Sequence, residues 1–171
     1  MSILREFIFN EPPDTRVHRM SLRLTGFLAL ERLEIRQIAK YVFAAQHIHE
    51  DDVPNSLRRL LIGFRDCDKD VVDNQLNFIV KMIHLEELEL VHPCIVFMTA
   101  LLLPSLQVKK LTLACCHFDS CNIVLRAARD CALRHLIFKC DKLDHMPHPE
   151  FIEPFLQRNS NVHVTVWMPT R

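Results

Sequence analysis

The sequence predicts an α/β solenoid, with a curved parallel sheet on its concave side and helices on its convex side. Three observations lead to this prediction. One short apolar pattern returns along the whole chain, its copies start 23 to 28 residues apart, and apolar residues at helical spacing fill the intervals. Only two glycines occur in 171 residues, so a sheet-only fold with many tight turns is not expected.

The repeated pattern has apolar residues at its first, fourth and sixth positions. Its clearest copy is Leu85-Glu-Glu-Leu88-Glu-Leu90. The other copies begin at Leu4, Leu30, Leu57, Val108 and Leu133, and a weaker one begins at Asn161, where the first apolar position is lost. The fourth and sixth residues should alternate inward from a strand, while the first turns inward from the preceding corner. We therefore expect about six repeats plus a closing strand, in a single domain over residues 1–171.

The intervals between copies are predicted to contain helices, because parallel strands need a long return connection. The inward residues of four such helices would be Val17, Met20, Leu24 and Phe27; Ile38, Val42, Ala45 and Ile48; Val72, Leu76, Ile79 and Ile83; and Val124, Ala127 or Ala128, and Cys131. Asp119 and Ser120 are the expected caps of the last of these. Cys94 to Leu103 predicts a nearly all-apolar helix. Three prolines near the C-terminus leave room only for a short helix, near Phe151 to Gln157.

These motifs resemble the leucine-rich-repeat family over nearly the whole chain. The match is clearest from Val108 to Leu143, where Cys116 follows the strand as in the cysteine-containing, ribonuclease-inhibitor-like variety. The equivalent positions of other repeats hold Ile38, Arg65, Pro93 and Asp141. The resemblance implies protein binding. Such repeats are common in the substrate receptors of F-box-type ubiquitin ligases. No F-box segment is visible before Leu4, so a ubiquitin-ligase role would need a further N-terminal region or another adaptor.

The function that we expect is noncatalytic: an intracellular adaptor module that binds a protein partner through its concave strand face. The alternative is the substrate-recognition part of an F-box-type ubiquitin ligase. The third, fifth and seventh positions of each motif should point outward from the strands onto that face. The candidate partner-binding residues are Arg32, Glu34, Arg59, Leu61, Glu87, Glu89, Val91, Lys110, His135, Ile137 and Lys139.

The predicted face has a second interpretation. Strands about 4.8 Å apart would make Arg59, Glu87 and Lys110 side-by-side neighbours of alternating charge. Such a row is either a solvated ladder, in which each neighbour pair contributes about 0.2–1 kcal/mol, or a selective binding site. The two are compatible, because a partner could still use Glu87 and Glu89. Trp167, on the last strand, is expected to cover the end of the stack rather than to anchor a partner.

The charge balance argues against a nucleic-acid partner. Lys plus Arg and Asp plus Glu both number 21, whereas a general polyanion binder needs a basic surplus. The pair Glu86-Glu87 lies between the basic pairs Arg58-Arg59 and Lys109-Lys110 and would oppose a phosphate track. Two glycines are too few for a phosphate-binding loop, so no nucleotide cofactor is expected.

The seven cysteines predict reduced thiols in a cytoplasmic or nuclear protein, because their number is odd and no signal peptide is visible. A zinc site would need four converging ligands, but the repeat scatters the candidates Cys115, Cys116, His117, Cys121, Cys131, His135, Cys140, His145 and His148. We expect buried free cysteines instead, with no metal, no cofactor and no Cys-His catalysis. The most apolar run, Cys94 to Leu103, is about half a bilayer span, so no membrane association is expected.

Both ends of the predicted stack lack an obvious cap. The first strand starts near Leu4, and the closing segment Val162 to Trp167 is rich in strand formers. An uncovered edge strand is a template for further pairing. Three explanations remain open, in this order: the chain is a piece of a longer protein, it pairs end to end or with another subunit through its C-terminal strand, or flanking residues shield its ends.

Overall fold

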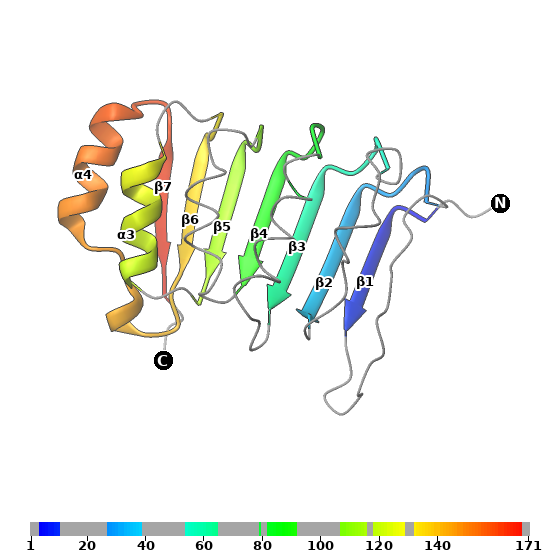
Figure 1. The fold of residues 1–171 in the computed structure, drawn as a ribbon, viewed down its shortest axis with the longest axis horizontal. Helices are drawn as coiled ribbons and strands as arrows, with labels where there is room; N and C mark the ends of the chain where they lie inside the picture. The colour runs from blue at the N-terminus through cyan, green and yellow to red at the C-terminus, as the bar shows by residue number, and fades with distance from the viewer. Residues whose placement is uncertain are drawn as a thin grey trace.

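Within the residues that the structure describes, the protein forms a seven-stranded, wholly parallel sheet with the two α-helices α3 (Phe118–Ala127) and α4 (Pro149–Arg158) on one of its faces (Figure 1). The computed structural model describes residues 4–10, 27–38, 54–64, 79, 82–91, 107–115, 118–128 and 132–168. The strands follow one another in chain order, so the predicted α/β class with one strand per repeat is confirmed. They are β1 Glu6–Asn10, β2 Arg32–Ile38, β3 Arg59–Phe64, β4 Glu87–Val91, β5 Lys110–Ala114, β6 His135–Lys139 and β7 His163–Trp167.

The strand register places equal motif positions side by side. The third positions form one row across the sheet, made of Glu6, Arg32, Arg59, Glu87, Lys110, His135 and His163. The fifth positions form the next row in the same way. One irregularity occurs in β2, where the pairing with β3 shifts between Ile35 and Ile38. The extra residue bends β2 locally, as a β-bulge does.

One face of the sheet is apolar and forms the core. The fourth and sixth positions of β2 to β6 are 0–2% exposed, namely Leu33, Ile35, Leu60, Ile62, Leu88, Leu90, Leu111, Leu113, Leu136 and Phe138. The first positions Leu30, Leu57, Leu85, Val108 and Leu133 are buried beside them. Burying one such side chain stabilises the fold by about 1.5–3 kcal/mol. At the sheet's edges the burial is incomplete, since Phe7 and Val164 are only partly buried.

Two helices cover the apolar face at its C-terminal end: α3 Phe118–Ala127 and α4 Pro149–Arg158. Val124 of α3 and Phe155 of α4 are fully buried in the core. Arg126 lies over the ring of Phe151, with its Cζ 4.3 Å from the ring centroid, and so joins the two helices. A short 3-10 helix, η5 Leu143–His145, precedes α4.

Several predicted helix positions are corrected by the structure. Helix α3 begins at Phe118, so Asp119 and Ser120 lie inside its first turn instead of capping it. Helix α4 is longer than predicted because Pro149 takes the first helical position, where no backbone N–H is needed. Ile38 belongs to strand β2, and Ile83 is an exposed turn residue.

The other predicted helices lie mostly outside the described residues. This holds for residues 17–26, 39–48, 72–78 and 94–103, and for Cys131. Within the third of these predicted helices, Ile79 is helical and 1% exposed, as its inward position requires. Among the helices that are described, none is long and apolar enough to cross a membrane.

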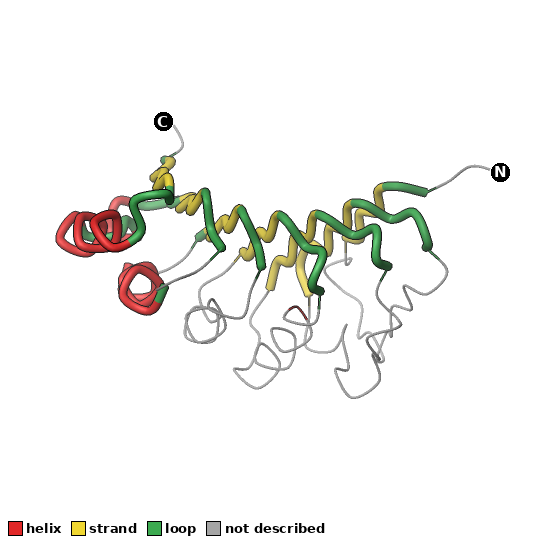
Figure 2. The backbone as a smooth tube through the Cα atoms, turned by 90° about the horizontal axis from the view of Figure 1, so that it is seen from above, coloured by secondary structure: helices red, strands yellow, loops and turns green. Residues whose placement is uncertain are grey.

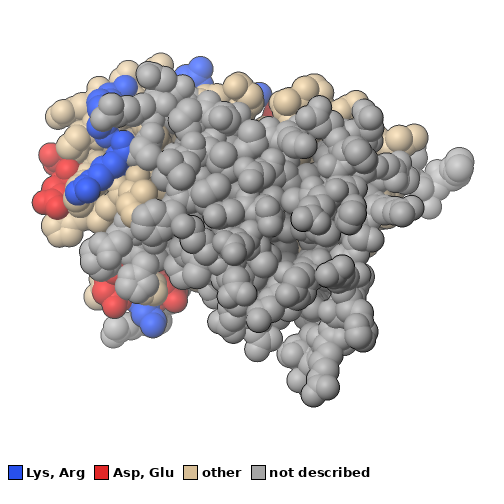
Figure 3. Space-filling model, in the orientation of Figure 1, with Lys and Arg blue, Asp and Glu red and all other residues tan. Residues whose placement is uncertain are grey.

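Seen from above, the strands lie along a shallow arc, with α3 and α4 on its outer side (Figure 2). The helix side of the molecule carries mixed charge where it is described, since basic and acidic side chains lie near one another around α3 and α4 (Figure 3). The opposite side is formed by the third, fifth and seventh positions of the strands. We call this side the polar face.

Candidate partner-binding hollow on the polar face

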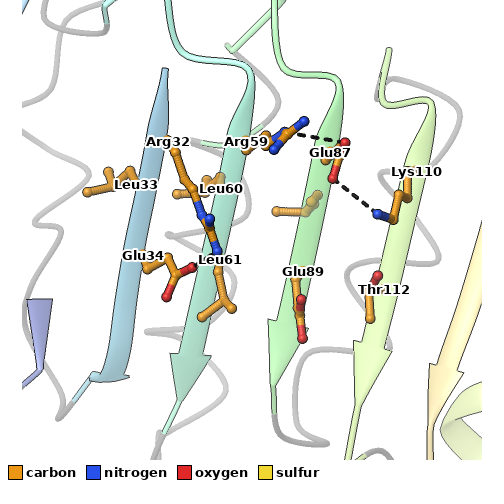
Figure 4. A pocket seen from close by; sticks show the side chains of 11 residues that line it. Arg32, Leu33, Glu34, Arg59, Leu60, Leu61, Glu87, Glu89, Lys110 and Thr112 are labelled. Atoms are coloured by element: carbon orange, nitrogen blue, oxygen red, sulfur yellow. Dashed lines mark hydrogen bonds and ion pairs between the residues drawn. The ribbon is translucent and has the colours of Figure 1, made fainter. Parts of the chain in front are cut away.

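The polar face contains a hollow of about 210 Å³ across strands β2 to β5 (Figure 4). Its lining comes from four consecutive motifs, because the shared register puts their third and fifth positions next to each other. The lining residues are Arg32, Leu33, Glu34, Arg59, Leu60, Leu61, Glu87, Leu88, Glu89, Lys110 and Thr112. Most of these side chains are charged, and the apolar Leu61 lies between the two acidic side chains of its row.

On β2, the carboxylate of Glu34 is held by two arginines of its own strand. Arg32 Nη2 donates to Glu34 Oε1, while Arg36 donates to Glu34 Oε2 from Nη2 at 2.6 Å and from Nε at 3.0 Å. The three residues alternate along the strand, so all project from the same face. Arg32 also approaches Glu6 Oε1 on β1, with Nη1 3.7 Å away. Glu34 is only 1% exposed, and its two oxygens are both engaged.

The surroundings of Glu34 keep it ionised. Burial alone would raise the pKa of this carboxyl, because it disfavours the charged form. The hydrogen bonds from Arg36 and Arg32, and the positive charges of both guanidinium groups, act in the opposite direction. Their combined effect outweighs burial and holds the pKa of Glu34 below its ordinary value. A buried carboxylate with paired charges is therefore a permanent part of the polar face.

A second cluster crosses three strands in the third-position row. Glu87 of β4 forms ion pairs on both sides: Arg59 Nε of β3 lies 3.4 Å from Oε1, and Lys110 Nζ of β5 lies 3.2 Å from Oε2 and donates to it. The predicted row of alternating charge is thus present as real ion pairs. All three side chains are partly exposed, so each pair contributes only about 0.2–1 kcal/mol.

The third acidic side chain, Glu89 of β4, pairs with a more distant strand. Lys139 Nζ of β6 lies 2.6 Å from Glu89 Oε1. The side chain of Lys139 therefore passes over β5, whose residues at the two neighbouring positions are the small Thr112 and Ala114. Both of these are buried, which is consistent with cover by the long lysine side chain.

The structure places all eleven sequence-predicted residues on strands and seven of them around the hollow. Those seven are Arg32, Glu34, Arg59, Leu61, Glu87, Glu89 and Lys110. Val91, His135, Ile137 and Lys139 belong to the polar face but do not line the hollow. Five contributing residues were not among the predicted set: Leu33, Leu60, Leu88 and Thr112, which line the hollow, and Arg36, which clamps Glu34. The outward places of Thr112 and Arg36 in the motif would have identified these two, whereas the three leucines are inward fourth positions.

The C-terminal end of the polar face is different, being largely uncharged. His135 and His163 lie side by side with ring centroids 5.9 Å apart. Trp167 projects from the same face and is 56% exposed. The prediction that Trp167 covers the end of the stack is therefore wrong: the side chain belongs to the outward row, and Phe155 and Val162 are the buried apolar residues near this end.

The described cysteines, Cys115, Cys121 and Cys140, are free thiols, and the last two are part of the core. Cys121 and Cys140 are buried, and their Sγ atoms donate to the carbonyl oxygen of His145 at 3.9 Å and 3.4 Å. Burial raises the pKa of Cys121 to about 12 and also raises the pKa of Cys140. Both therefore stay protonated at neutral pH and are poor nucleophiles.

Among the described residues, no group of three or more His, Cys, Asp or Glu side chains could hold a metal ion. Cys116, His117 and Cys131, three of the scattered zinc-ligand candidates that were not expected to form a site, lie outside those residues. The described part of the polar face thus offers charge, hydrogen-bond donors and separate apolar side chains, such as Leu61, Val91 and Ile137.

Comparison with known proteins identifies no relative: no family model matches the chain, and no curated protein or solved structure is significantly similar to it.

Proposed function

We propose that the chain is a leucine-rich-repeat protein that acts as a noncatalytic interaction module, with a protein partner seated on the polar face. The repeat assignment is supported by one L-x-x-L-x-L motif per strand, by parallel strands in chain order, and by helices on one face. The proposed partner is an intracellular protein, located in the cytoplasm or the nucleus.

One observation carries the proposal. Four consecutive strands contribute to a single hollow, and its lining combines ordered charged side chains with an apolar residue, Leu61. Such a combination suits protein recognition, since a half-buried apolar contact supplies affinity and surrounding charges supply specificity and orientation. The polar clusters are already formed without a partner, so their side chains lose little freedom on binding.

The test is affinity capture from cell extract with the full-length chain carrying Leu61→Trp. This substitution fills the hollow without changing the charge, so capture of the partner should fall at least about tenfold. Leu28→Trp is the matched control: Leu28 is 86% exposed in the turn before β2 and does not line the hollow. It should leave capture unchanged.

The outcomes separate the alternatives. Loss of the captured protein with Leu61→Trp but not with Leu28→Trp supports recognition at the polar face. Equal capture by both variants and by the wild type would rule the hollow out as the docking site. The identity of the captured protein also decides the second proposal, substrate recognition for an F-box-type ubiquitin ligase, since that role requires components of a cullin ligase among the captured proteins.

A further inference from the structure

The two ion clusters of the polar face have the same composition, two cations around one carboxylate. Glu34 lies between Arg32 and Arg36, and Glu87 lies between Arg59 and Lys110. In both clusters each carboxylate oxygen already has its own cationic partner. Glu34, 1% exposed, is closed to a further donor, whereas Glu87, 35% exposed, keeps part of its accepting capacity.

The cations, in contrast, keep unused donors. A guanidinium group has five N–H donors and an ammonium group has three. Arg59 approaches Glu87 most closely through Nε, at 3.4 Å, and within the described residues its two terminal nitrogens donate no hydrogen bond. Lys110 meets Glu87 through one contact of its ammonium group. Both side chains are substantially exposed, at 58% and 41%, so a ligand can reach these donors.

Basic side chains also outnumber acidic side chains around the hollow. The basic side chains in and beside it are Arg32, Arg36, Arg59, Lys110 and Lys139, whereas the acidic ones are Glu34, Glu87 and Glu89. Glu6, farther out on β1, offsets part of this excess through its 3.7 Å approach to Arg32. The polar face is therefore locally cationic and rich in donors, although the whole chain has zero net charge.

We propose that the partner docks through an acidic peptide segment, with its carboxylates on Arg59 and Lys110 and an apolar side chain on Leu61. The inference rests on the proposed function and adds the chemistry of the docking segment. A carboxylate fits because it is an acceptor of opposite charge, and because arginine binds it through two parallel hydrogen bonds. Leu61 lies between Glu34 and Glu89 in the fifth-position row, two residues along β3 from Arg59.

A peptide suits this face better than a nucleic acid. A phosphate backbone needs a continuous track of cations, but Glu87 stands between Arg59 and Lys110 in the row and would lie against the phosphates. The separated acidic groups of a peptide can instead occupy the individual cations. An oligonucleotide is therefore the competing ligand that the experiment includes.

The experiment measures fluorescence anisotropy of short labelled peptides with the full-length chain at low salt. Three probes differ only in charge: alternating Glu and Leu, alternating Gln and Leu, and alternating Lys and Leu. The Glu probe should bind most tightly. Arg59→Gln and Lys110→Gln should each weaken its binding roughly fivefold, whereas Glu87→Gln should tighten it by a similar factor. Tighter binding by Glu87→Gln, in contrast to weaker binding by Arg59→Gln and Lys110→Gln, is specific to an acidic ligand, because removal of the Glu87 charge frees two cations.

Matched controls come from the neighbouring pair Glu86 and Lys109. Their ion pair, at 3.0 Å, resembles that of Glu87 and Lys110 at 3.2 Å, but neither residue lines the hollow. Glu86→Gln and Lys109→Gln should change binding of the Glu probe by less than about twofold. Added salt should abolish even this small change.

The proposal is overturned if the folded chain prefers the Lys or Gln probe, if Glu87→Gln weakens binding of the Glu probe, or if a single-stranded oligonucleotide binds as tightly with the same dependence on Arg59 and Lys110. Failure here is distinguishable from failure of the proposed function. A partner whose capture depends on Leu61, together with no preference for the Glu probe, would leave the interaction module intact and remove only the acidic docking segment.

Discussion

The two faces of the sheet are built from the same strands but differ in how much their residues vary from strand to strand. On the apolar face, the fourth and sixth positions of β2 to β6 are interchangeable large apolar residues. On the polar face, charge and side-chain type vary along each row. Its third-position row alone contains Glu6, Arg32, Glu87, Lys110 and His135, among others.

The apolar face therefore determines the fold, and the polar face contains the residues that are particular to this protein. Stacking repeats requires only that each strand bury similar apolar volume against its neighbours, so the apolar face is repetitive. The polar face is free of that requirement, and yet its charges form ordered pairs instead of an arbitrary mixture. We therefore look for recognition on the polar face and for stability on the apolar face.

The largest expected effect contrasts adjacent residues of β6. Leu136→Asp places a charge in the core, where the leucine is fully buried, and should destabilise the chain by more than about 4 kcal/mol. Ile137→Asp changes the neighbouring residue, which is half-buried on the polar face, and should cost less than about 1.5 kcal/mol. Urea denaturation followed by circular dichroism measures both. Similar losses from the two variants would mean that the faces are assigned wrongly.

An intermediate effect is expected at Glu34, the one carboxylate that is buried on the polar face. Its folded-state pKa lies below the ordinary value of 4.5, so its ionised form stabilises the fold above that pH. This contribution is lost as the pH falls through the folded-state pKa. Glu34→Gln should therefore cost about 1–2 kcal/mol at pH 7 and progressively less below pH 4.5.

The measurement compares the unfolding free energies of wild type and Glu34→Gln between neutral and acid pH. Asp141, whose pKa is also lowered, mainly by its hydrogen bond to His145, is present in both proteins, so its effect cancels. A difference between the two proteins that stays constant with pH would show that Glu34 contributes by packing and not by charge.

The smallest expected effect concerns the ladder itself. A double-mutant cycle with Arg59→Ala and Glu87→Ala should give a coupling energy of about 0.2–1 kcal/mol, the range for exposed ion pairs. The value should fall in concentrated salt. A coupling well above this range would mean that the row is a structural element of the sheet, which would weaken its assignment to recognition.

The sheet could be predicted from the sequence because its pattern is local and repeated. Spacing alone gave every strand, the inward positions of β2 to β6 and the neighbours across the third-position row, with Arg59, Glu87 and Lys110 side by side as expected. The strand ends were less certain. Ile38 was assigned to a helix because its apolar spacing continues into the next segment, whereas a bulge extends β2 to include it.

The charge pairs of the site were only partly predictable, because side-chain reach depends on three-dimensional geometry. Arg36 turns back along its own strand to Glu34, and Lys139 crosses a neighbouring strand to Glu89. Neither contact follows from the row assignments. Trp167 stands in the outward seventh position, as its place in the motif predicts, and is 56% exposed; only its expected role as a cover for the end of the stack was wrong.

The ion pair between Lys139 and Glu89 has a mechanical consequence. It joins β6 to β4 across the inner side of the arc, whereas the backbone ladder joins only adjacent strands. Flattening the arc would pull the two side chains apart, and tightening it would press them together. The pair therefore acts as a weak tie that resists flattening, and a partner that flattens the arc must break it.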